Sequence, residues 1–365
     1  MGIRKKVKNI VETSLQKHRH QAMRKNEYKK YEDPRRVAIY SSIILSDEQK
    51  KQIDDLFVNH YGKKIPYIWH RHFTAFTGQF DPYYIPESLF IPEFEYYMNN
   101  RHDYINVFAD KNVLAMIAKG IGIRMPKSII SCSNGVLRDK EYHLIQLDDA
   151  LDLLPDEICF AKPTIDSDSG RGCILIDKKQ GNVAQQIKNL GDNFVVQERI
   201  ICSDSIRKIY PNSVNTFRVM TYIWNEEIVC APVIMRIGRG GSFLDNAHAG
   251  GMFIAVNKDG TLHKTAFTEF KEEYNEHPDT HLIYNGYIID NFDKVLSSAI
   301  KMHSAIPQLG VINWDFTINK DEEPVLIEAN TSGGSIWLFQ MAWGCGVFED
   351  KTIAILEWLK KKNAQ

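Results

Sequence analysis

The sequence predicts an α+β protein built from two or three lobes. A chain of 365 residues is too long for one simple core. Its C-terminal half contains two pairs of apolar runs that flank short polar breaks, at 214–237 and 311–330, as antiparallel hairpins do. Its N-terminal third instead alternates strand-like and helix-like segments, which predicts a small α/β lobe.

The bulk composition is that of an ordinary globular protein, with 44% hydrophobic and 25% charged residues. A net charge of -1 argues against wholesale nucleic-acid binding. The six cysteines form no CxxC pair, which predicts neither a metal finger nor a disulfide framework and favours reduced thiols in the cytoplasm. The apolar run 337–348 is too short to span a bilayer, and the N-terminus lacks the apolar core of a secretory signal.

Residues 1–33 are predicted to form a basic amphipathic helix. Residues 1–36 carry twelve Lys and Arg against four Asp and Glu, and apolar residues recur at helical spacing from Ile3 to Leu15. Such a helix can lie on the anionic inner face of a membrane or dock on an acidic partner. A solvated helix packed loosely on the body explains the same pattern equally well.

Residues 34–105 are predicted to form the small α/β lobe. The run 36–45 is rich in β-branched and aromatic residues and is expected to be a strand, as is 65–70. Between them, 46–61 begins with an acidic first turn, which predicts a helix. The alternation favours parallel strands with a helical crossover.

Residues 106–200 contain the first candidate anion site. Asp110 is expected to cap a helix that ends at Gly120 or Gly122. Lys111 would then lie in the first turn, where a cation is disfavoured unless an anion is bound there as well. Farther along, Lys162 lies at the end of a predicted strand that begins near Ile158.

A polar loop follows that strand at 166–172, and a second strand is predicted from Cys173. Two glycines in the loop, Gly170 and Gly172, let backbone N–H groups face phosphate oxygens without a Cβ in the way. The loop matches neither GxxxxGK[ST] nor GxGxxG, and an ordinary turn explains it equally well. A further strand is predicted over 192–200, and Glu198 lies near its end.

Residues 201–365 begin with a hairpin whose strands carry Arg218 and Arg236. The segment 237–251 then contains five glycines in fifteen residues, which predicts a mobile lid. Arg239 and His248 within it are polar groups that such a lid could deliver to a substrate. Helices are predicted at 289–305 and 348–361.

The central element is the hairpin at 311–334. If Ile318 faces Val325 across the loop 319–324, Asp315 falls opposite Glu328. Asn313 falls opposite Asn330, and all four polar side chains share one face. Facing carboxylates destabilise a sheet, so the sequence predicts a cation between them, and Mg²⁺ fits these oxygen ligands. The alternative is the solvated face of a surface hairpin.

The order of these pieces resembles the ATP-grasp superfamily. Within it, the stretches NTFRVMT, HAGG and IEANTSGG are similar to the sugar-transfer associated ATP-grasp branch, over about residues 106–349. The resemblance implies two α+β subdomains that clamp ATP, preceded by the small α/β lobe and the basic helix. The implied domains are 1–33, 34–105, 106–200 with the phosphate loop, and 201–365 with the magnesium site and the lid.

The resemblance also implies roles for individual residues. Asp315, Glu328 and Asn330 would bind Mg²⁺, and Arg218, Arg236, Arg239 and His248 are the candidates for catalysis. The nucleotide would be held by Lys111, Lys162, Ser167, Ser169, Gly170, Arg171, Gly172, Gln197, Glu198, Ile200 and Asn215. Many relatives place Arg two residues before the metal-binding Asp, where this chain has Asn313, so the acceptor side is less defined than the nucleotide side.

The function implied is an ADP-forming carboxylate–amine ligase that uses ATP and Mg²⁺ and passes through an acylphosphate. Its partners would be a small carboxylate and an amine, one of them tied to surface-glycan assembly, with no nucleic acid. Two alternatives remain open at this point: a kinase acting on a sugar-type hydroxyl, with His248 or Asp245 as base, and a nucleotide-sensing scaffold without catalysis. The sequence also leaves open peripheral membrane contact through the basic helix and a homodimer.

Overall fold

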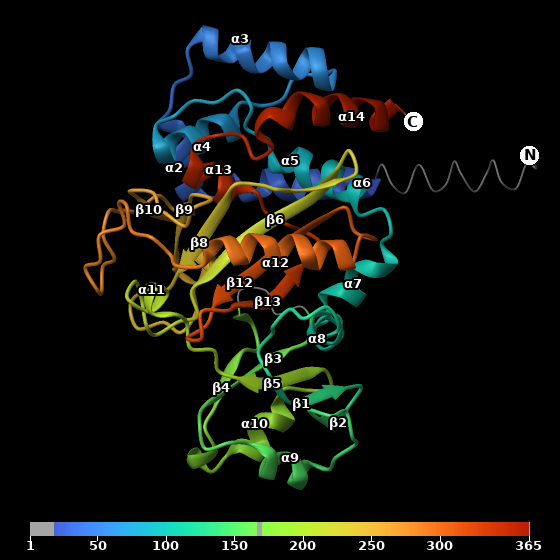
Figure 1. Cartoon of the computed structure of the whole chain (residues 1–365). Coiled ribbons are helices and arrows are strands. Elements are labelled where there is room, and N and C mark those ends of the chain that lie inside the picture. The colour runs from blue at the N-terminus through green and yellow to red at the C-terminus, as the bar shows by residue number, and fades with distance from the viewer. Residues whose placement is uncertain (1–17, 166–169, 365) are drawn as a thin grey trace, which may run out of the picture. The chain divides into compact units, whose positions relative to one another are not determined.

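The computed structural model describes residues 18–165 and 170–364 of the chain. They divide into two compact units (Figure 1). Unit 1 comprises the described residues of Met1–Asn100 together with Phe270–Glu272 and Ser332–Gln365, and unit 2 comprises Arg101–Glu269 and Glu273–Thr331. No described helix is long and apolar enough to cross a membrane.

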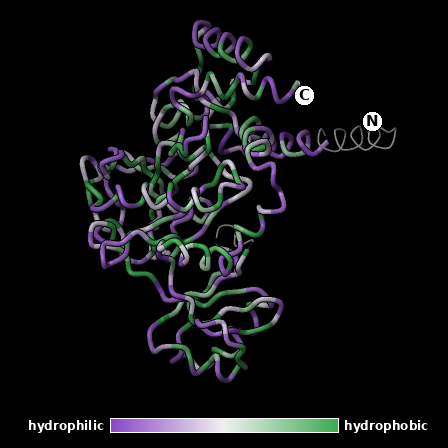
Figure 2. The backbone as a smooth tube through the Cα atoms, turned by 45° about the vertical axis from the view of Figure 1, so that its right-hand side comes forward, coloured by the Kyte–Doolittle hydropathy of each residue, from purple (hydrophilic) through white to green (hydrophobic). Residues whose placement is uncertain are grey.

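Unit 1 is helical over its described residues. Residues 18–30 are helical. The other elements are α2 (Pro34–Ser41), α3 (Asp47–Leu56), the π-helix η1 (Phe57–Tyr61), α4 (Ile68–Thr77), α5 (Glu87–Leu89), the π-helix η2 (Phe90–Glu95), α6 (Tyr96–Met98), α13 (Trp337–Trp343), the 3₁₀ turn η6 (Glu349–Lys351) and α14 (Thr352–Ala364). Helix α3, at the top of Figure 2, is largely hydrophilic and buries Ile53 and Leu56.

Two predicted strands of this region are helices, so the expectation of parallel strands within 34–105 was wrong. At 36–45 the β-branched run is overridden by a helix start: Asp33 accepts a hydrogen bond from Arg35 N, and Pro34 occupies the first turn of α2. Of the run 65–70, residues 68–70 begin α4, most of whose residues are buried. Such a helix lacks a polar stripe, and periodicity alone does not distinguish it from a buried strand.

The helix predicted at 46–61 is confirmed as α3 followed by η1. Ser46 and Gln49 form the reciprocal hydrogen bonds of a capping box. The described part of the basic N-terminal helix is packed more tightly than a solvated helix would be. His20, Glu27 and Tyr31 are all buried, and the His20 ring contacts that of Tyr96 at a centroid distance of 4.4 Å. Residues 1–17 lie outside the described part of the chain.

Unit 2 contains two antiparallel sheets. Its first part is α7 (Asp103–Ala109), α8 (Lys111–Gly120), β1 (Ser128–Ser133), β2 (Val136–Asp139), α9 (Leu147–Leu153), β3 (Cys159–Pro163), β4 (Ile174–Ile176), the 3₁₀ turn η4 (Lys178–Gln180), α10 (Val183–Asn189) and β5 (Phe194–Glu198). These strands form a five-stranded sheet in the order β2-β1-β5-β3-β4. The order brings the end of β3, with Lys162, beside β5, which ends at Glu198.

The rest of unit 2 is built on an eight-stranded sheet in the order β11-β10-β9-β8-β6-β12-β13, with β7 also paired to β6. Its elements are α11 (Asp204–Arg207), β6 (Thr216–Trp224), β7 (Glu227–Cys230), β8 (Val233–Ile237), the 3₁₀ turn η5 (Ala247–Ala249), β9 (Met252–Val256), β10 (Ala266–Thr268), β11 (Glu273–Tyr274), α12 (Phe292–Ala305), β12 (Val311–Ile318) and β13 (Pro324–Asn330).

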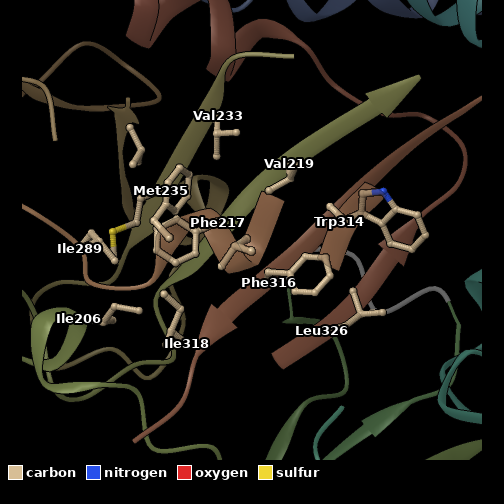
Figure 3. Packing of buried hydrophobic residues seen from close by; sticks show 14 of the residues in the cluster. Ile206, Phe217, Val219, Val233, Met235, Ile289, Trp314, Phe316, Ile318 and Leu326 are labelled. Carbon is tan, nitrogen blue, oxygen red and sulfur yellow. The ribbon is translucent and has the colours of Figure 1, made fainter. Parts of the chain in front are cut away.

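One face of this sheet forms the main hydrophobic core of unit 2 (Figure 3). Because side chains alternate along a strand, Trp314 and Phe316 of β12 point into the core. Phe217 and Val219 of β6 do the same, and α12 packs against β6 and β12. The alternate residues, Asp315 on β12 and Arg218 on β6, therefore share the opposite face.

A buried histidine ties α12 to this core. The Nε2–H of His303 donates to the Leu309 carbonyl at 2.8 Å, and its Nδ1 accepts from the Thr221 hydroxyl at 2.7 Å. Thr221 in turn accepts from the Trp314 indole N–H at 2.7 Å. Burial lowers the pKa of His303 to about 4, although the hydrogen bond to Leu309 opposes that shift. The ring is therefore neutral in the folded protein at pH 7.

This histidine should make stability depend on pH. Its folded pKa is depressed below the usual 6.5, so its contribution is complete above 6.5 and is lost as pH falls towards 4. We expect the difference in unfolding free energy between wild type and His303→Phe, measured in urea, to shrink from pH 7 to pH 5. A difference independent of pH would contradict a neutral, bonded His303.

Candidate active site

The register of the β12–β13 hairpin places the predicted polar side chains together. Asp315 pairs with Glu328 and Asn313 pairs with Asn330, as expected. A β-bulge follows, so Ile318 pairs with Pro324, and the expected pairing of Ile318 with Val325 was wrong. The bulge gives β13 one extra residue. As a result Ile327 does not point into the core but lines a cavity beside Glu328.

The Asp315 carboxylate is fully buried and is held by two guanidinium groups. Arg218 Nε lies 2.5 Å from Asp315 Oδ1, and Arg236 contributes an NH2 group 2.9 Å from Oδ2. Burial alone would raise the pKa of Asp315, but Arg218 and Arg236 outweigh it and hold the pKa well below its usual range. Asp315 is therefore ionised at neutral pH.

These arginines correct one step of the sequence argument. That argument required a bound cation to keep Asp315 and Glu328 from repelling each other. In the structure Arg218 and Arg236 balance Asp315, and Lys111 Nζ lies 3.5 Å from Glu328 Oε2. The facing carboxylates therefore have protein cations beside them, and a metal ion is not needed to explain why the hairpin is stable.

Two buried lysines converge near Glu328. Asp110 caps α8 as predicted, accepting from Asn112 N and Val113 N, which places Lys111 in the first turn with 4% of it exposed. Lys162 is equally buried, and its Nζ donates to the Ile327 carbonyl at 3.3 Å. Burial and the nearby charge of Lys111 lower the pKa of Lys162 to about 8. Two like charges held this close under burial favour a bound anion.

A cavity of about 1250 Å³ in unit 2 is lined by many of the candidate residues. Its volume exceeds the upper end of typical small-ligand sites, which is about 1000 Å³. The candidates among its lining residues are Lys162, Gly170, Gln197, Glu198, Ile200, Arg236, Asp315 and Glu328. The cavity therefore brings together residues from both sheets of unit 2.

Two of the residues expected to hold the nucleotide, Gln197 and Glu198, lie at the end of β5. Gln197 is buried, and its Nε2 donates to the Pro126 carbonyl at 3.2 Å. Glu198 Oε1 accepts from Lys127 N at 3.0 Å, and Glu198 N donates to the Lys127 carbonyl at 2.9 Å. Glu198 is thus already used to pair β5 with the chain at 126–127, and only part of its carboxylate remains for a ligand.

The predicted phosphate loop is described in part. Ser167 and Ser169 lie outside the described residues. Gly170 and Gly172 have φ of +79° and +72°, which favours glycine. A Cβ on Gly172 would lie 2.9 Å from the Pro163 ring, so that position also needs glycine on steric grounds. Arg171 between them is exposed.

The glycine-rich segment 237–251, predicted to be a mobile lid, makes hydrogen bonds to other parts of unit 2. Gly238 N donates to Asn215 Oδ1 at 3.1 Å, and the buried His277 donates from Nε2 to the Gly238 carbonyl at 2.9 Å. Farther along, Asp245 Oδ2 accepts from Thr216 N at 3.0 Å. These bonds attach both the base and the middle of the segment to the large sheet.

Three predicted site residues act within this anchor. The Asn215 carboxamide also accepts from Ser213 Oγ and donates to the Tyr210 carbonyl, so these three hydrogen bonds have a structural role. Arg239 donates to the Gly250 carbonyl and the Tyr274 hydroxyl, both at 2.7 Å. His248 Nδ1 lies 2.8 Å from Glu269 Oε2. None of the three lines the cavity, among the residues that the structure describes.

Gly238→Ala tests this anchor. The new Cβ would lie 2.5 Å from Ser213 Oγ and 2.8 Å from the Tyr210 ring, so something must shift. We expect the free energy of unfolding to fall by about 1–3 kcal/mol, as for an overpacked site. The matched control is Gly120→Ala in α8, where a Cβ meets nothing within 4 Å and should raise stability. Equal urea midpoints for the two variants would contradict the anchor.

The hairpin also fits a magnesium ion bound together with phosphate. Glu328 has 27% of its side chain exposed, and Asn330 donates from Nδ2 to Asp315 Oδ2 at 3.4 Å, which leaves its Oδ1 as a ligand. Within 18–165 and 170–364, no group of three or more His, Cys, Asp or Glu side chains could hold a metal by itself. Mg²⁺ usually takes one or two carboxylates and completes its shell with phosphates and water, so an ion at this hairpin would need the nucleotide as a ligand.

Sequence reasoning missed some residues of the site. Thr216 Oγ1 accepts from Arg236 and donates to Asp245 Oδ2, so it links the arginine to the glycine-rich segment. Ile327 and the thiol-bearing Cys173 line the cavity as well. Thr216 could have been found from the sequence, because it lies two residues before Arg218 on the predicted strand and therefore on the same face. Ile327 could not have been found, because the hydrophobic pattern of the sequence does not reveal a β-bulge.

Two lysines, an acidic hairpin and a cavity between two antiparallel sheets define an ATP-grasp protein. The chain belongs to the sugar-transfer associated ATP-grasp family, whose model matches residues 90–354. The fold class and the family that the sequence predicted are thereby confirmed. The division into four domains remains a prediction. A search of the curated proteins gave no match.

Solved structures similar to this chain include an ADP complex of PurK, an N5-carboxyaminoimidazole ribonucleotide synthetase (10% identity, 63% of this chain and 46% of that chain, TM-score 0.40). An L-amino acid ligase from Bacillus licheniformis has 13% identity over 65% of this chain and 46% of that chain, with a TM-score of 0.38. The VanG D-Ala:D-Ser ligase from Enterococcus faecalis has 15% identity over 70% and 62%, with a TM-score of 0.41. This chain thus spans about half the length of the first two.

Proposed function

We propose that this protein is an ADP-forming carboxylate–amine ligase that uses ATP and Mg²⁺. The observation that carries the proposal is a pair of buried lysines near Glu328: Lys162 lines the large cavity together with Glu328, and Lys111 lies 3.5 Å from the Glu328 carboxylate. Membership of the ATP-grasp family supports ATP as the anion. The description of the family supports a substrate linked to sugar transfer, such as a uronic acid or a sugar-linked carboxylate.

In the first step a carboxylate oxygen attacks the γ-phosphorus of ATP, the bond to the β-phosphate oxygen breaks, and ADP leaves. Lys111 and Lys162 would hold phosphate oxygens, and their charges would offset the charge that develops on the transferring group. Glu328, Asn330 and Asp315 would hold Mg²⁺. When bound, the ion neutralises phosphate charge and orients the γ-phosphate.

In the second step an amine nitrogen attacks the acyl carbon, the C–O bond to phosphate breaks, and phosphate leaves with the electron pair and accepts the amine proton. Arg236 lines the cavity and is the cation that supports this step. Its guanidinium is fixed by Thr216 Oγ1 and by Asp315, so it needs no rearrangement to act. Closure of the site against water would protect the acylphosphate from hydrolysis.

The deciding experiment is a screen of pooled amino acids and uronic acids for ADP formation, with products identified by mass. A ligase gives one amide and one free phosphate for each ADP, and only when acid and amine are both present. A stable phosphorylated product without free phosphate would identify a kinase instead. Asp245 is a poor base for that kinase, because its Oδ2 accepts from Thr216 and lies 3.6 Å from Arg236.

The basic N-terminal segment is proposed to contact an anionic surface. Because His20, Glu27 and Tyr31 are buried in unit 1, removal of 1–33 would damage the fold, and removal of 1–17 is the sharper test. We expect the shortened protein to keep its turnover and its melting temperature but to lose binding to vesicles that contain phosphatidylserine. Undiminished binding to those vesicles would reject the docking role, and vesicles of phosphatidylcholine alone are the control.

A further inference from the structure

Three segments of unit 1 meet at one buried carboxylate, that of Glu93. Its oxygens accept from Tyr61 Oη at 2.7 Å and from Asn363 Nδ2 at 2.6 Å. The carboxylate also pairs with Arg24, which comes from the helix at 18–30. Tyr61 ends η1 and Asn363 lies in the last turn of α14. The charge of Glu93 is therefore offset inside the protein, and its contacts hold the three segments side by side.

Exposed lysines lie around this junction. Lys360 of α14 donates from Nζ to the Asn59 carbonyl at 3.1 Å, and a Cβ on Gly62 would lie 3.2 Å from its Cε. Lys63 follows Gly62 directly, and its Nζ lies 4.8 Å from the centroid of the Tyr61 ring. Two ammonium groups from distant parts of the sequence are therefore neighbours on the surface of unit 1.

These lysines differ from others on the same unit in having no acidic partner. Within the described part of the chain, neither Lys63 nor Lys360 pairs with a carboxylate. The exposed lysines of α3 do have partners, namely Lys50 with Asp47 at 3.0 Å and Lys51 with Asp55 at 2.5 Å. Positive charge therefore remains unbalanced at the junction and is balanced on α3.

The pKa of Lys63 reflects this imbalance. Burial and the charge of Arg24 lower that pKa below its usual value of 10.5. An anion beside the ammonium group would act in the opposite direction and favour its charged form. The surroundings of Lys63 thus favour a bound anion, in agreement with the missing carboxylates.

Two aromatic rings lie beside the same cations. Lys362 Nζ lies 5.6 Å from the centroid of the Trp358 ring, which lies 6.2 Å from that of Tyr97. Tyr97 Oη donates to Asn363 Oδ1 at 3.0 Å, and both rings are partly exposed. Trp and Tyr favour the boundary between water and lipid. We define the basic corner as the four cations of this junction: Arg24, Lys63, Lys360 and Lys362.

We propose that the basic corner is a docking surface for an anionic phospholipid membrane. The inference deepens the docking proposed above for the N-terminal segment, since residues 1–17 directly precede the helix at 18–30. The cations would contact lipid phosphates and carboxylates, and the Trp358 and Tyr97 rings would lie among the headgroups. Each cation near the surface adds to the same binding free energy, so the corner and the segment would act together.

The test compares two double variants of the full chain. Lys63→Gln with Lys360→Gln changes the corner, and Lys50→Gln with Lys51→Gln is the matched control, because each removes two positive charges from unit 1. Binding is measured by co-sedimentation with vesicles of phosphatidylserine and phosphatidylcholine. We expect the corner variant to bind about 30-fold more weakly than wild type and the control less than about threefold more weakly. Both variants should keep the melting temperature of wild type, since exposed charges contribute little to stability.

Equal losses in the two variants would show attraction by net charge alone and would overturn the proposal. Unchanged binding of the corner variant would also overturn it. So would wild-type protein that binds phosphatidylserine vesicles no better than vesicles of phosphatidylcholine alone.

A second measurement needs no variant. Lysines of the wild-type protein are acetylated with and without phosphatidylserine vesicles, and the modified positions are mapped by mass spectrometry. We expect the vesicles to slow the modification of Lys63 and Lys360 and to leave Lys50 and Lys51 unchanged. Uniform protection, or none, would overturn the proposal. Equal protection of the corner by polyuridine RNA would assign it to polyanions in general and would overturn the membrane as its partner.

The corner and the N-terminal segment can fail separately. If removal of 1–17 abolishes vesicle binding while the corner variant binds as wild type does, only the segment docks and the present proposal is overturned. If the corner variant loses binding while the shortened protein keeps it, the corner docks alone and the role of the segment is rejected.

Discussion

Glu328→Gln is expected to abolish ADP formation while the fold stays intact. The side chain is 27% exposed, and its one ion pair is with Lys111 at 3.5 Å. Lys111 is 4% exposed and loses its partner carboxylate, so the free energy of unfolding should fall by about 1–3 kcal/mol, less than for Asp315. The same charge would hold Mg²⁺ and orient Lys111, so kcat/KM should fall by roughly 10²-fold or more.

A second carboxylate on the same hairpin provides the control. Glu323 lies in the β12–β13 loop, is 55% exposed at its side chain and pairs with Arg124. Glu323→Gln removes one negative charge from the hairpin without touching the cavity, so its turnover should match wild type. The assay is ADP release in the presence of the acid and amine found by the screen. Wild-type turnover in Glu328→Gln would refute the metal assignment.

Asp315→Asn should cause the largest loss of stability of any single change at the site. The carboxylate is 1% exposed at its side chain and pairs with Arg218 and Arg236, which are themselves largely buried. Removal of one partner from a buried ion pair leaves the other charges unbalanced and typically costs about 3–5 kcal/mol. Urea unfolding monitored by circular dichroism measures the effect directly.

A double-mutant cycle can show whether the loss of stability comes from unbalanced arginine charges or from disrupted packing. Arg218→Met removes one of the stranded cations, so Arg218→Met together with Asp315→Asn should be less destabilised than the sum of the single changes. Asp321→Asn, in the exposed hairpin loop and 3.7 Å from Arg124, should be neutral. If Asp315→Asn unfolds at the urea midpoint of wild type, Asp315 does not offset the buried charges of Arg218 and Arg236, and the proposed charge balance is wrong.

These two predictions differ because the two carboxylates do different work. Asp315 is paired with the guanidinium groups of Arg218 and Arg236, so it stabilises unit 2 as well as being a candidate ligand of Mg²⁺. Glu328 faces the cavity, has Lys111 and Lys162 near it and is partly exposed. The sequence shows two acidic residues on one face, and only the structure separates a role in stability from a role in binding.

Much of the site could be predicted because alternation along a strand is regular. The pairs of Asp315 with Glu328 and of Asn313 with Asn330 follow from the hydrophobic pattern of the hairpin, and the Asp110 cap follows from local helix-start chemistry. The bulge at Ile327 was not predictable, since one extra residue leaves the apolar pattern readable in either register.

Other errors came from competition between local signals and tertiary contacts. The run 36–45 has strand propensity, yet Asp33 and Pro34 start a helix there. The hydrogen bonds of the glycine-rich segment could not be predicted, because their partners Asn215, His277 and Asp279 are distant in sequence. Hydrogen bonds between residues far apart in the sequence do not change its hydrophobic periodicity, so they cannot be predicted from it. The same is true of the guanidinium pairs around Asp315, which require the order of β6, β8 and β12 in the sheet.

The most direct test of the central claim is a crystal structure with a non-hydrolysable ATP analogue and Mg²⁺. We expect the γ-phosphate between the Lys111 and Lys162 ammonium groups, with the ion on Asp315, Glu328 and Asn330. A nucleotide bound elsewhere, or a cavity in which Glu328 touches neither phosphate nor ion, would contradict the account.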